Sequence, residues 1–91
     1  MHTGELVMNY VIAVFVSRSE TLSFANMLKR MGIPVMVIQT PKEAGRTCGL
    51  SAKFSYNDFN DAKSIMQKMN FSSFQGFYLQ QTTSGQPFIL R

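Results

Sequence analysis

Runs of apolar residues mark the strands that this chain is expected to form. Residues 10–16, Tyr-Val-Ile-Ala-Val-Phe-Val, are rich in β-branched side chains and predict a buried strand. A short apolar run at 35–38 predicts a second strand, and alternating apolar and polar residues at 50–56 predict a third. A fourth strand is expected at 75–81. After a Thr-Ser-Gly-Gln turn, residues 88–90 are expected to return as a short edge strand, where the preceding proline is tolerated.

Helical signals fill the two longer intervals between these strands. Ser17 and Glu20 have the Ser-x-x-Glu spacing of a capping box, and Gly32 stands where a helix commonly ends. A second helix is expected to start with Asn57 or Asp58 as its cap and to end at Asn70. The apolar residues expected on the inner faces are Leu22, Ala25, Leu28 and Met31 in the first helix and Phe59, Ala62, Ile65, Met66 and Met69 in the second.

The order strand–helix–strand–strand–helix–strand is that of an α+β, ferredoxin-like βαββαβ sandwich. It predicts an antiparallel sheet with two helices on one face, extended by the C-terminal hairpin strand. Because crossovers between parallel strands are right-handed, the first two strands should run parallel with the third between them. We expect residues 9–91 to form this single domain and residues 1–8 to be a flexible tail.

The first strand is apolar on both of its sides. The two alternating sets are Val11, Ala13 and Phe15, and Ile12, Val14 and Val16. With both helices on one face of the sheet, the other face would expose an apolar patch unless something covers it, and such patches usually mark partners. We therefore expect a homodimer, packed sheet to sheet or edge to edge.

The connection between the second and third strands holds the only cysteine of the chain, Cys48. Lys42 and Arg46 precede it, and Gly49 follows it. A thiol reacts as its thiolate, and nearby cations, main-chain N–H groups and helix N-termini lower its pKa from about 8.5. Cys48 is therefore a candidate for sulfur chemistry. The alternative is a small apolar side chain packed under a loop, because free cysteines are often buried.

The same connection opens with a helix-start signal, in which Thr40 would be the N-cap, Pro41 the first helical residue and Glu43 the third. A single helical turn ending near Gly45 would present Cys48 at the entry to the third strand. Thr40 and Pro41 would then fix this turn, and Gly49 would allow a partner or another part of the backbone to approach closely.

The expected topology places other segments at this same end of the domain. The end of the first strand, the start of the first helix and the junction 70–74 should lie there, so Ser17, Arg18 and Ser19 should be near Cys48. A helix N-terminus offers free N–H donors and a partial positive charge, to which the nearby cations would add. We expect thiolate stabilisation or anion binding at this end.

Composition narrows the classes of function. The chain has 91 residues and a net charge of +4, which favours anionic partners. One cysteine cannot form an intrachain disulfide, the opening residues lack a signal-peptide pattern, and the longest apolar run is too short to span a bilayer. We therefore expect a soluble cytoplasmic protein without membrane contact.

Catalytic and metal-binding groups are sparse. The only histidine, His2, lies in the expected tail, and one cysteine with one histidine gives too few ligands for zinc. Asp58 and Asp61 suit the start of a helix, and no glycine-rich phosphate loop is present. We expect no cofactor, and we favour a carrier or accessory protein over an enzyme.

Nucleic-acid binding is a second class, because ferredoxin-like sheets can stack bases on aromatic side chains. The aromatic residues on or beside the expected strands are Tyr10, Phe15, Phe54, Tyr56, Phe77 and Tyr78. Residues 53–56 echo the RNA-recognition signature only faintly, so we favour core packing for these rings. A third class is a non-catalytic interaction or regulatory domain, which the apolar second face of the sheet would suit.

The segments Gly-Ile-Pro-Val, Thr-Pro-Lys-Glu and Cys-Gly-Leu-Ser-Ala-Lys-Phe, over a span of roughly 10–78, resemble the bacterial selenium/sulfur carrier-like family. The residues in register with that family's pattern are Thr40, Pro41, Cys48, Gly49, Lys53 and Phe54. Lys42 replaces the family's usual arginine, which keeps the charge and loses bidentate recognition of an oxyanion. Gly45 stands where a serine is typical.

The resemblance implies that Cys48 would hold a sulfur or selenium atom as a persulfide or selenosulfide. The implied partners are a donor protein and an acceptor protein. One thiol is sufficient for this exchange, and the absence of a second cysteine argues against a dithiol oxidoreductase.

Overall fold

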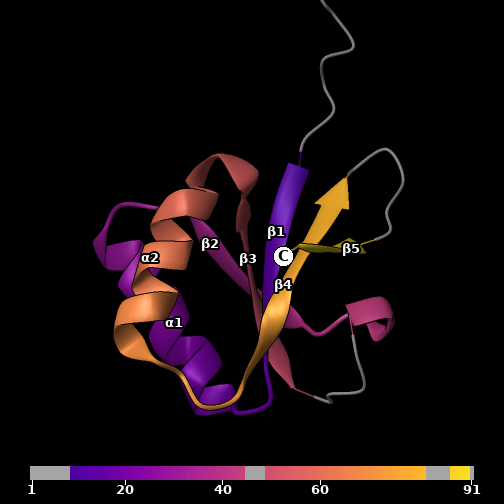
Figure 1. Ribbon diagram of the computed structural model, residues 1–91, viewed down its shortest axis with the longest axis horizontal. Helices are drawn as coiled ribbons and strands as arrows, with labels where there is room; N and C mark the ends of the chain where they lie inside the picture. Colours follow the sequence, from indigo (N-terminus) through magenta and orange to yellow (C-terminus); the bar gives the residue numbers. More distant parts are fainter. Residues whose placement is uncertain (1–8, 45–48, 82–86, 91) are drawn as a thin grey trace, which may run out of the picture.

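The computed structural model describes residues 9–44, 49–81 and 87–90 of the chain (Figure 1). Its elements are β1 (Asn9–Phe15), α1 (Arg18–Arg30), β2 (Val35–Gln39), the 3-10 turn η1 (Lys42–Ala44), β3 (Leu50–Ser55), the 3-10 turn η2 (Tyr56–Asp58), α2 (Phe59–Met69), β4 (Phe74–Gln81) and β5 (Pro87–Leu90). Every strand predicted from the sequence begins and ends within one residue of these bounds. The expected tail at 1–8 and the expected turn after β4 lie outside the described residues.

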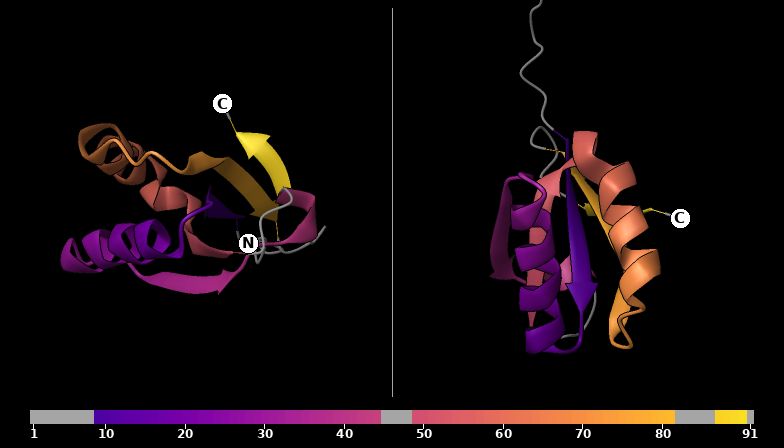
Figure 2. Two further views of the ribbon diagram at one scale, coloured as in Figure 1. Left: turned by 90° about the horizontal axis from the view of Figure 1, so that it is seen from below. Right: turned by 90° about the vertical axis from the view of Figure 1, so that its left-hand side faces the viewer.

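The sheet has the strand order β2-β3-β1-β4-β5, and all neighbouring strands are antiparallel. This confirms the ferredoxin-like βαββαβ topology, with β3 between the parallel strands β1 and β2. The added strand β5 pairs with β4 at the far edge. Both helices cover one face of the sheet, whereas η1 lies on the other side (Figure 2).

The main core lies between the helices and the sheet. Phe15 at the end of β1 is fully buried, and its ring centroid is 5.5 Å from that of Phe24 in α1 and 5.4 Å from that of Phe71. Phe54 and Phe77 also lie in this core, with centroids 6.5 Å apart. These buried rings cannot stack on nucleic-acid bases, so core packing accounts for half of the aromatic residues in question.

The buried face of α1 differs from the one expected. Leu22 and Met31 are 46% and 53% exposed, and the buried residues are Thr21, Phe24, Ala25 and Leu28. Three residues advance an α-helix by about 60° less than a full turn, so a strict spacing of three drifts to the opposite side within three steps. The observed spacing of three, four and seven keeps the side chains on one face.

Helix α1 ends just before Gly32, as predicted from the sequence. Gly32 has φ +81, its N–H donates to the Lys29 carbonyl at 2.9 Å, and the Ile33 N–H donates to the Leu28 carbonyl at 3.0 Å. These two bonds form a Schellman motif, and the buried side chains of Leu28 and Ile33 belong to the same core cluster. The break before β2 is therefore set by both backbone and packing.

The start of α2 also differs from the prediction. Asp58 makes no side-chain capping bond; instead, the hydroxyl of Ser55 accepts from the Asn57 N–H at 3.1 Å and caps η2, which runs straight into the helix. The helix ends at Asn70 in the left-handed conformation, as predicted. Ala62, Ile65 and Met66 form the buried face, Phe59 is half-buried, and Met69 is 44% exposed.

The second face of the sheet is covered at its centre by the chain itself. Ile12 and Val14 are fully buried in a cluster with Ala44 of η1, against which Ile38 and Tyr78 also pack. Val16, expected to share this face, lies past the end of β1 and is 57% exposed. The homodimer stays a prediction, and the centre of this face does not supply the apolar patch that suggested it.

Among the described helices, none is both long enough and apolar enough to cross a membrane.

Candidate functional site

Hydrogen bonds join four segments at the end of the domain where the sequence placed the site. The Val16 N–H donates to the Ser73 carbonyl at 3.0 Å, which ties the end of β1 to the junction before β4. The buried hydroxyl of Thr21 in α1 donates to the Leu50 carbonyl at 2.8 Å, which ties α1 to the start of β3. The predicted meeting of these segments is therefore confirmed for the described residues.

The N-terminus of α1 is capped through a relay that the sequence did not reveal. The hydroxyl of Ser17 accepts from the Glu20 N–H at 3.3 Å, as in a capping box. The expected return bond from the Glu20 carboxylate to the Ser17 N–H is absent from the described bonds. Instead, the Ser17 N–H donates to the Ser73 hydroxyl at 3.0 Å, and that hydroxyl donates to the Glu20 carboxylate at 2.6 Å.

The carboxylate of Glu20 accepts two further bonds from the same junction. The Ser73 N–H donates to it at 2.8 Å and the Ser72 hydroxyl at 3.1 Å. These bonds favour the ionised form, so the Ser73 hydroxyl first, and then the Ser73 N–H, lower the pKa of Glu20 below its ordinary value. No local sequence signal could have identified Ser73, because it lies 53 residues from Glu20.

Two donors remain open at the start of α1. Within the described part of the chain, no group accepts from the main-chain N–H of Arg18 or of Ser19. The Arg18 side chain is exposed, and the hydroxyl of Ser19 lies 2.9 Å from that of Ser17. This end of the helix therefore presents two N–H groups, hydroxyls and a cation, all of which suit a negatively charged partner.

The side chain of Thr40 bonds to the residue that precedes β3 and does not cap η1, the turn that follows Thr40. Its N–H and its hydroxyl both donate to the Gly49 carbonyl, at 3.1 and 3.0 Å. A hydroxyl has one proton to give, so the buried Ser51 hydroxyl, 2.7 Å away, donates to the Thr40 oxygen. The expected capping role of Thr40 is therefore wrong for its side chain, although η1 does follow, closed by an Ala44 N–H to Pro41 carbonyl bond of 3.0 Å.

Gly49 is buried beside the end of β1. A Cβ added at this position would lie 3.5 Å from the carbonyl oxygens of Phe15 and Val16, which is ordinary van der Waals contact. Packing within the described chain therefore does not require glycine here. The close approach expected at Gly49 remains a prediction about another molecule.

The two described cations of the expected site begin on opposite faces of the sheet. Arg18 opens α1 on the helix face, whereas Lys42 is exposed in η1, whose Ala44 packs on the second face. Arg46 and Cys48 lie outside the described residues, so their convergence with Arg18 and Lys42 stays a prediction. Across the described part of the chain, no group of three or more His, Cys, Asp or Glu could hold a metal ion.

Comparison with models of known protein families identifies the family of this chain. Residues 10–78 match the model of the family described as "Putative Se/S carrier protein-like". The chain belongs to this family. The Se/S carrier-like match runs from β1 into β4 and includes the whole connection between β2 and β3, while β5 lies beyond it. No curated protein and no solved structure gives a significant match.

Proposed function

We propose that this protein carries sulfur or selenium on Cys48, as a persulfide or selenosulfide, between a donor and an acceptor protein. The observation that carries the proposal is the family match, which spans the segment containing Cys48. The hydrogen bonds around Gly49, the next residue along the chain, support it. They tie the main chain immediately after the cysteine to Thr40, and Gly49 itself lies beside the carbonyl groups of Phe15 and Val16.

The exchange needs one thiol and no external oxidant or reductant. In loading, the Cys48 thiolate attacks the terminal sulfur of a donor persulfide. A new S–S bond forms as the donor's S–S bond breaks, and the donor leaves as a thiolate. In delivery, an acceptor nucleophile attacks the same terminal atom, and the Cys48 thiolate leaves.

The polar end of the domain would assist by stabilising the thiolate. The open N–H groups at the start of α1 and the Arg18 side chain would supply positive potential from the helix face, and Lys42 would add a second exposed cation from the other face. A lower thiol pKa raises both the thiolate fraction available for loading and the leaving ability of Cys48 in delivery.

Incubation with a cysteine desulfurase and isotopically labelled cysteine tests the proposal. We expect intact-mass analysis to show one added sulfur atom, released by dithiothreitol. Cys48→Ser is a clean control because the chain has no other cysteine, and it should gain no sulfur. An unmodified wild-type mass, combined with a thiol pKa near about 8.5 from the pH dependence of alkylation, would reject the carrier role.

A further inference from the structure

The outer edge of β2 presents unpaired main-chain groups. β2 is the terminal strand of the sheet, and no described strand lies on its outer side (Figure 2). Thr40 and Gly49, the pair that follows Gln39 and Leu50 in the β2–β3 ladder, form a hydrogen-bonded pair, because the Thr40 N–H donates to the Gly49 carbonyl. Such pairs alternate along an antiparallel ladder, so Val35, Val37 and Gln39 direct their N–H and C=O groups outward. An exposed edge of this kind is a template for one more strand.

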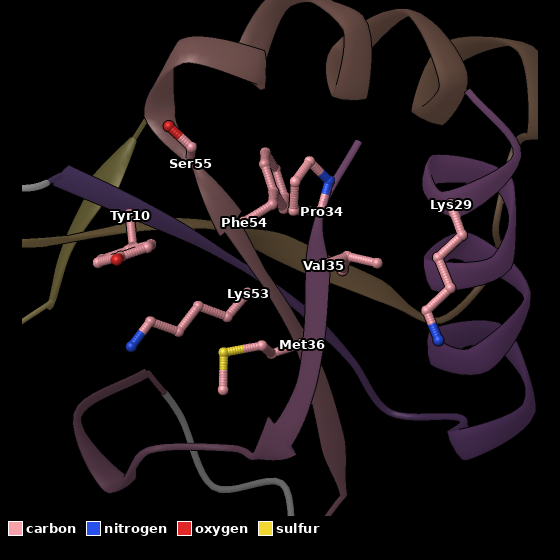
Figure 3. Close-up of a pocket in the computed structure, with 8 residues that line it drawn as sticks. All are labelled: Tyr10, Lys29, Pro34, Val35, Met36, Lys53, Phe54 and Ser55. Atoms are coloured by element: carbon pink, nitrogen blue, oxygen red, sulfur yellow. The ribbon is translucent and has the colours of Figure 1, made fainter. Parts of the chain in front are cut away.

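A groove of about 560 Å³ lies at the start of this edge strand (Figure 3). Its floor is largely apolar, and Met36, which points into solvent from β2, is 60% exposed. The residues that line the groove are Tyr10, Lys29, Pro34, Val35, Met36, Lys53, Phe54 and Ser55.

Two lysines and no acid belong to this lining. In Figure 3, Lys53 lies with Met36 on one side of β2, whereas Lys29 extends from α1 on the other side. The Lys53 ammonium sits 4.5 Å from the centroid of the Tyr10 ring, which holds it over the second face of the sheet. Because the strand order is β2-β3-β1, this contact carries the Lys53 ammonium over the inner strands. Lys53 would have to leave the Tyr10 ring to meet a strand added outside β2, whereas Lys29 lines the groove from the helix face.

We propose that the β2 edge and this groove bind an extended segment of a partner protein in which apolar side chains are flanked by carboxylates. The main chain of that segment would pair with Val35, Val37 and Gln39, and its carboxylates would meet Lys29 and, once its side chain swings outward from Tyr10, Lys53. A second copy of this chain fits less well. Pairing through β2 would join two molecules that each carry a net charge of +4, and β2, with the sequence Val-Met-Val-Ile-Gln, offers no carboxylate to the lysines of the other copy.

The identity of the partner rests on the proposed carrier function: the docked segment would belong to the sulfur donor or acceptor. β2 runs directly into Thr40, which is bonded to Gly49 next to Cys48 in the sequence. A segment docked along β2 would lead its own protein toward that end of the domain. Docking and sulfur exchange would then occur on adjoining surfaces.

Titration of the ¹⁵N-labelled full-length protein with two blocked peptides tests the surface. The first probe is Glu-Thr-Val-Ile-Val-Thr-Glu, and the second is Lys-Thr-Val-Ile-Val-Thr-Lys. We expect the acidic peptide to shift the amide signals of Val35, Val37 and Gln39 saturably, and the basic peptide to bind about two- to fivefold more weakly for each ion pair lost. Equal binding of the two peptides, or shifts confined to other elements, would overturn the proposal.

Matched variants separate main-chain pairing from charge. Val37→Pro removes an outward N–H that β3 does not use, so it should weaken binding about fivefold or more, whereas Val37→Ala should not. The double variant Lys29→Glu, Lys53→Glu should reverse the preference between the peptides, and Lys68→Glu, an exposed change on α2, should leave it unaltered. Circular dichroism confirms that each variant is folded.

Two outcomes distinguish this inference from its alternatives. Shifts of the same β2 amides on concentrating the protein without peptide would assign the edge to a second copy and overturn the acidic partner. Cys48→Ser should bind the acidic peptide like the wild type. If peptides bind and Cys48 takes up no sulfur, the carrier function fails alone; if sulfur is taken up and neither peptide binds, the docking surface fails alone.

Discussion

Single residues join parts of this chain that lie far apart in the sequence, and Glu20 is the clearest case. Its carboxylate accepts three hydrogen bonds from Ser72 and Ser73, and the Ser73 hydroxyl passes the interaction on to the Ser17 N–H. One acidic side chain therefore fixes both the start of α1 and the junction before β4. Removal of its charge should loosen both.

We expect Glu20→Gln to destabilise the protein near neutral pH and to reduce the loss of stability in acid. The pKa of Glu20 is lowered in the folded state, so its contribution is complete above the unfolded pKa and is lost as the pH falls through the folded pKa. Urea unfolding at about pH 7 and about pH 3 measures both effects. Ser64→Ala, at an exposed position in α2 that carries no titratable group, is the control and should leave the pH dependence unchanged. An unchanged pH dependence in Glu20→Gln would contradict the assignment.

Substitution of Gly49 tests whether glycine is needed at this position for folding or for sulfur exchange. Because an added Cβ would make only ordinary contacts, Gly49→Ala should change the free energy of unfolding by no more than about 0.5 kcal/mol. If a donor or acceptor approaches the main chain here, sulfur loading of the same variant should slow by about tenfold. The checks are urea unfolding and the initial rate of persulfide formation. A normal rate would show that glycine has no part in exchange.

At the scale of elements, the turn between α1 and β2 requires a residue in the left-handed conformation at position 32. Gly32 has φ +81 and nothing lies within 4 Å of the position where a Cβ would be. Gly32→Ala should therefore destabilise the protein by about 1–2 kcal/mol, the cost of a side chain in the left-handed region. Gly32→Asn should cost less, because asparagine tolerates that region better. Equal unfolding midpoints in urea for the two variants would contradict this explanation.

The elements themselves were well specified by the sequence, and their ends were less so. The alternation at 50–56 and the β-branched run at 10–16 gave strands within one residue, because burial on one or both faces dictates those patterns. The caps were harder. Ser55, rather than Asp58, caps the entry to α2, because a 3-10 turn precedes the helix and moves the start of the helical segment.

The candidate site could be predicted only as a location. Topology alone brings Ser17 and the start of β3 to one end of the sheet, and this was foreseen. The hydrogen bonds of Ser73 to Glu20 and of Ser51 to Thr40 could not be predicted from the sequence. Serine and threonine are common, and their partners depend on exact spacing in three dimensions. The packing of η1 on the second face also gave no signal in the sequence, because the buried residue of that turn is a single alanine.

At the scale of the whole molecule, the three-residue turn η1 packs on the centre of the second face of the sheet. Ala44 is 2% exposed and packs on the fully buried Ile12 and Val14. Ala44→Asp would bury a carboxylate against these side chains, so we expect η1 to lift away and the apolar face to open. Increased binding of a hydrophobic dye and a larger mass by light scattering should follow. Lys42→Asp, at an exposed position of the same turn, should show neither change.

The position of β1 has a consequence for how the fold opens. It is paired along both edges, and its central residues are covered on both faces, by the helices on one and by η1 on the other. Exposing its amides requires separation from β3 or β4, so we expect them to exchange most slowly with deuterated solvent, at a rate that reports global unfolding. The outward-facing amides of β2 should exchange orders of magnitude faster. Hydrogen exchange would therefore identify the exposed edge of the proposed docking strand without isotopic or chemical labelling of the protein.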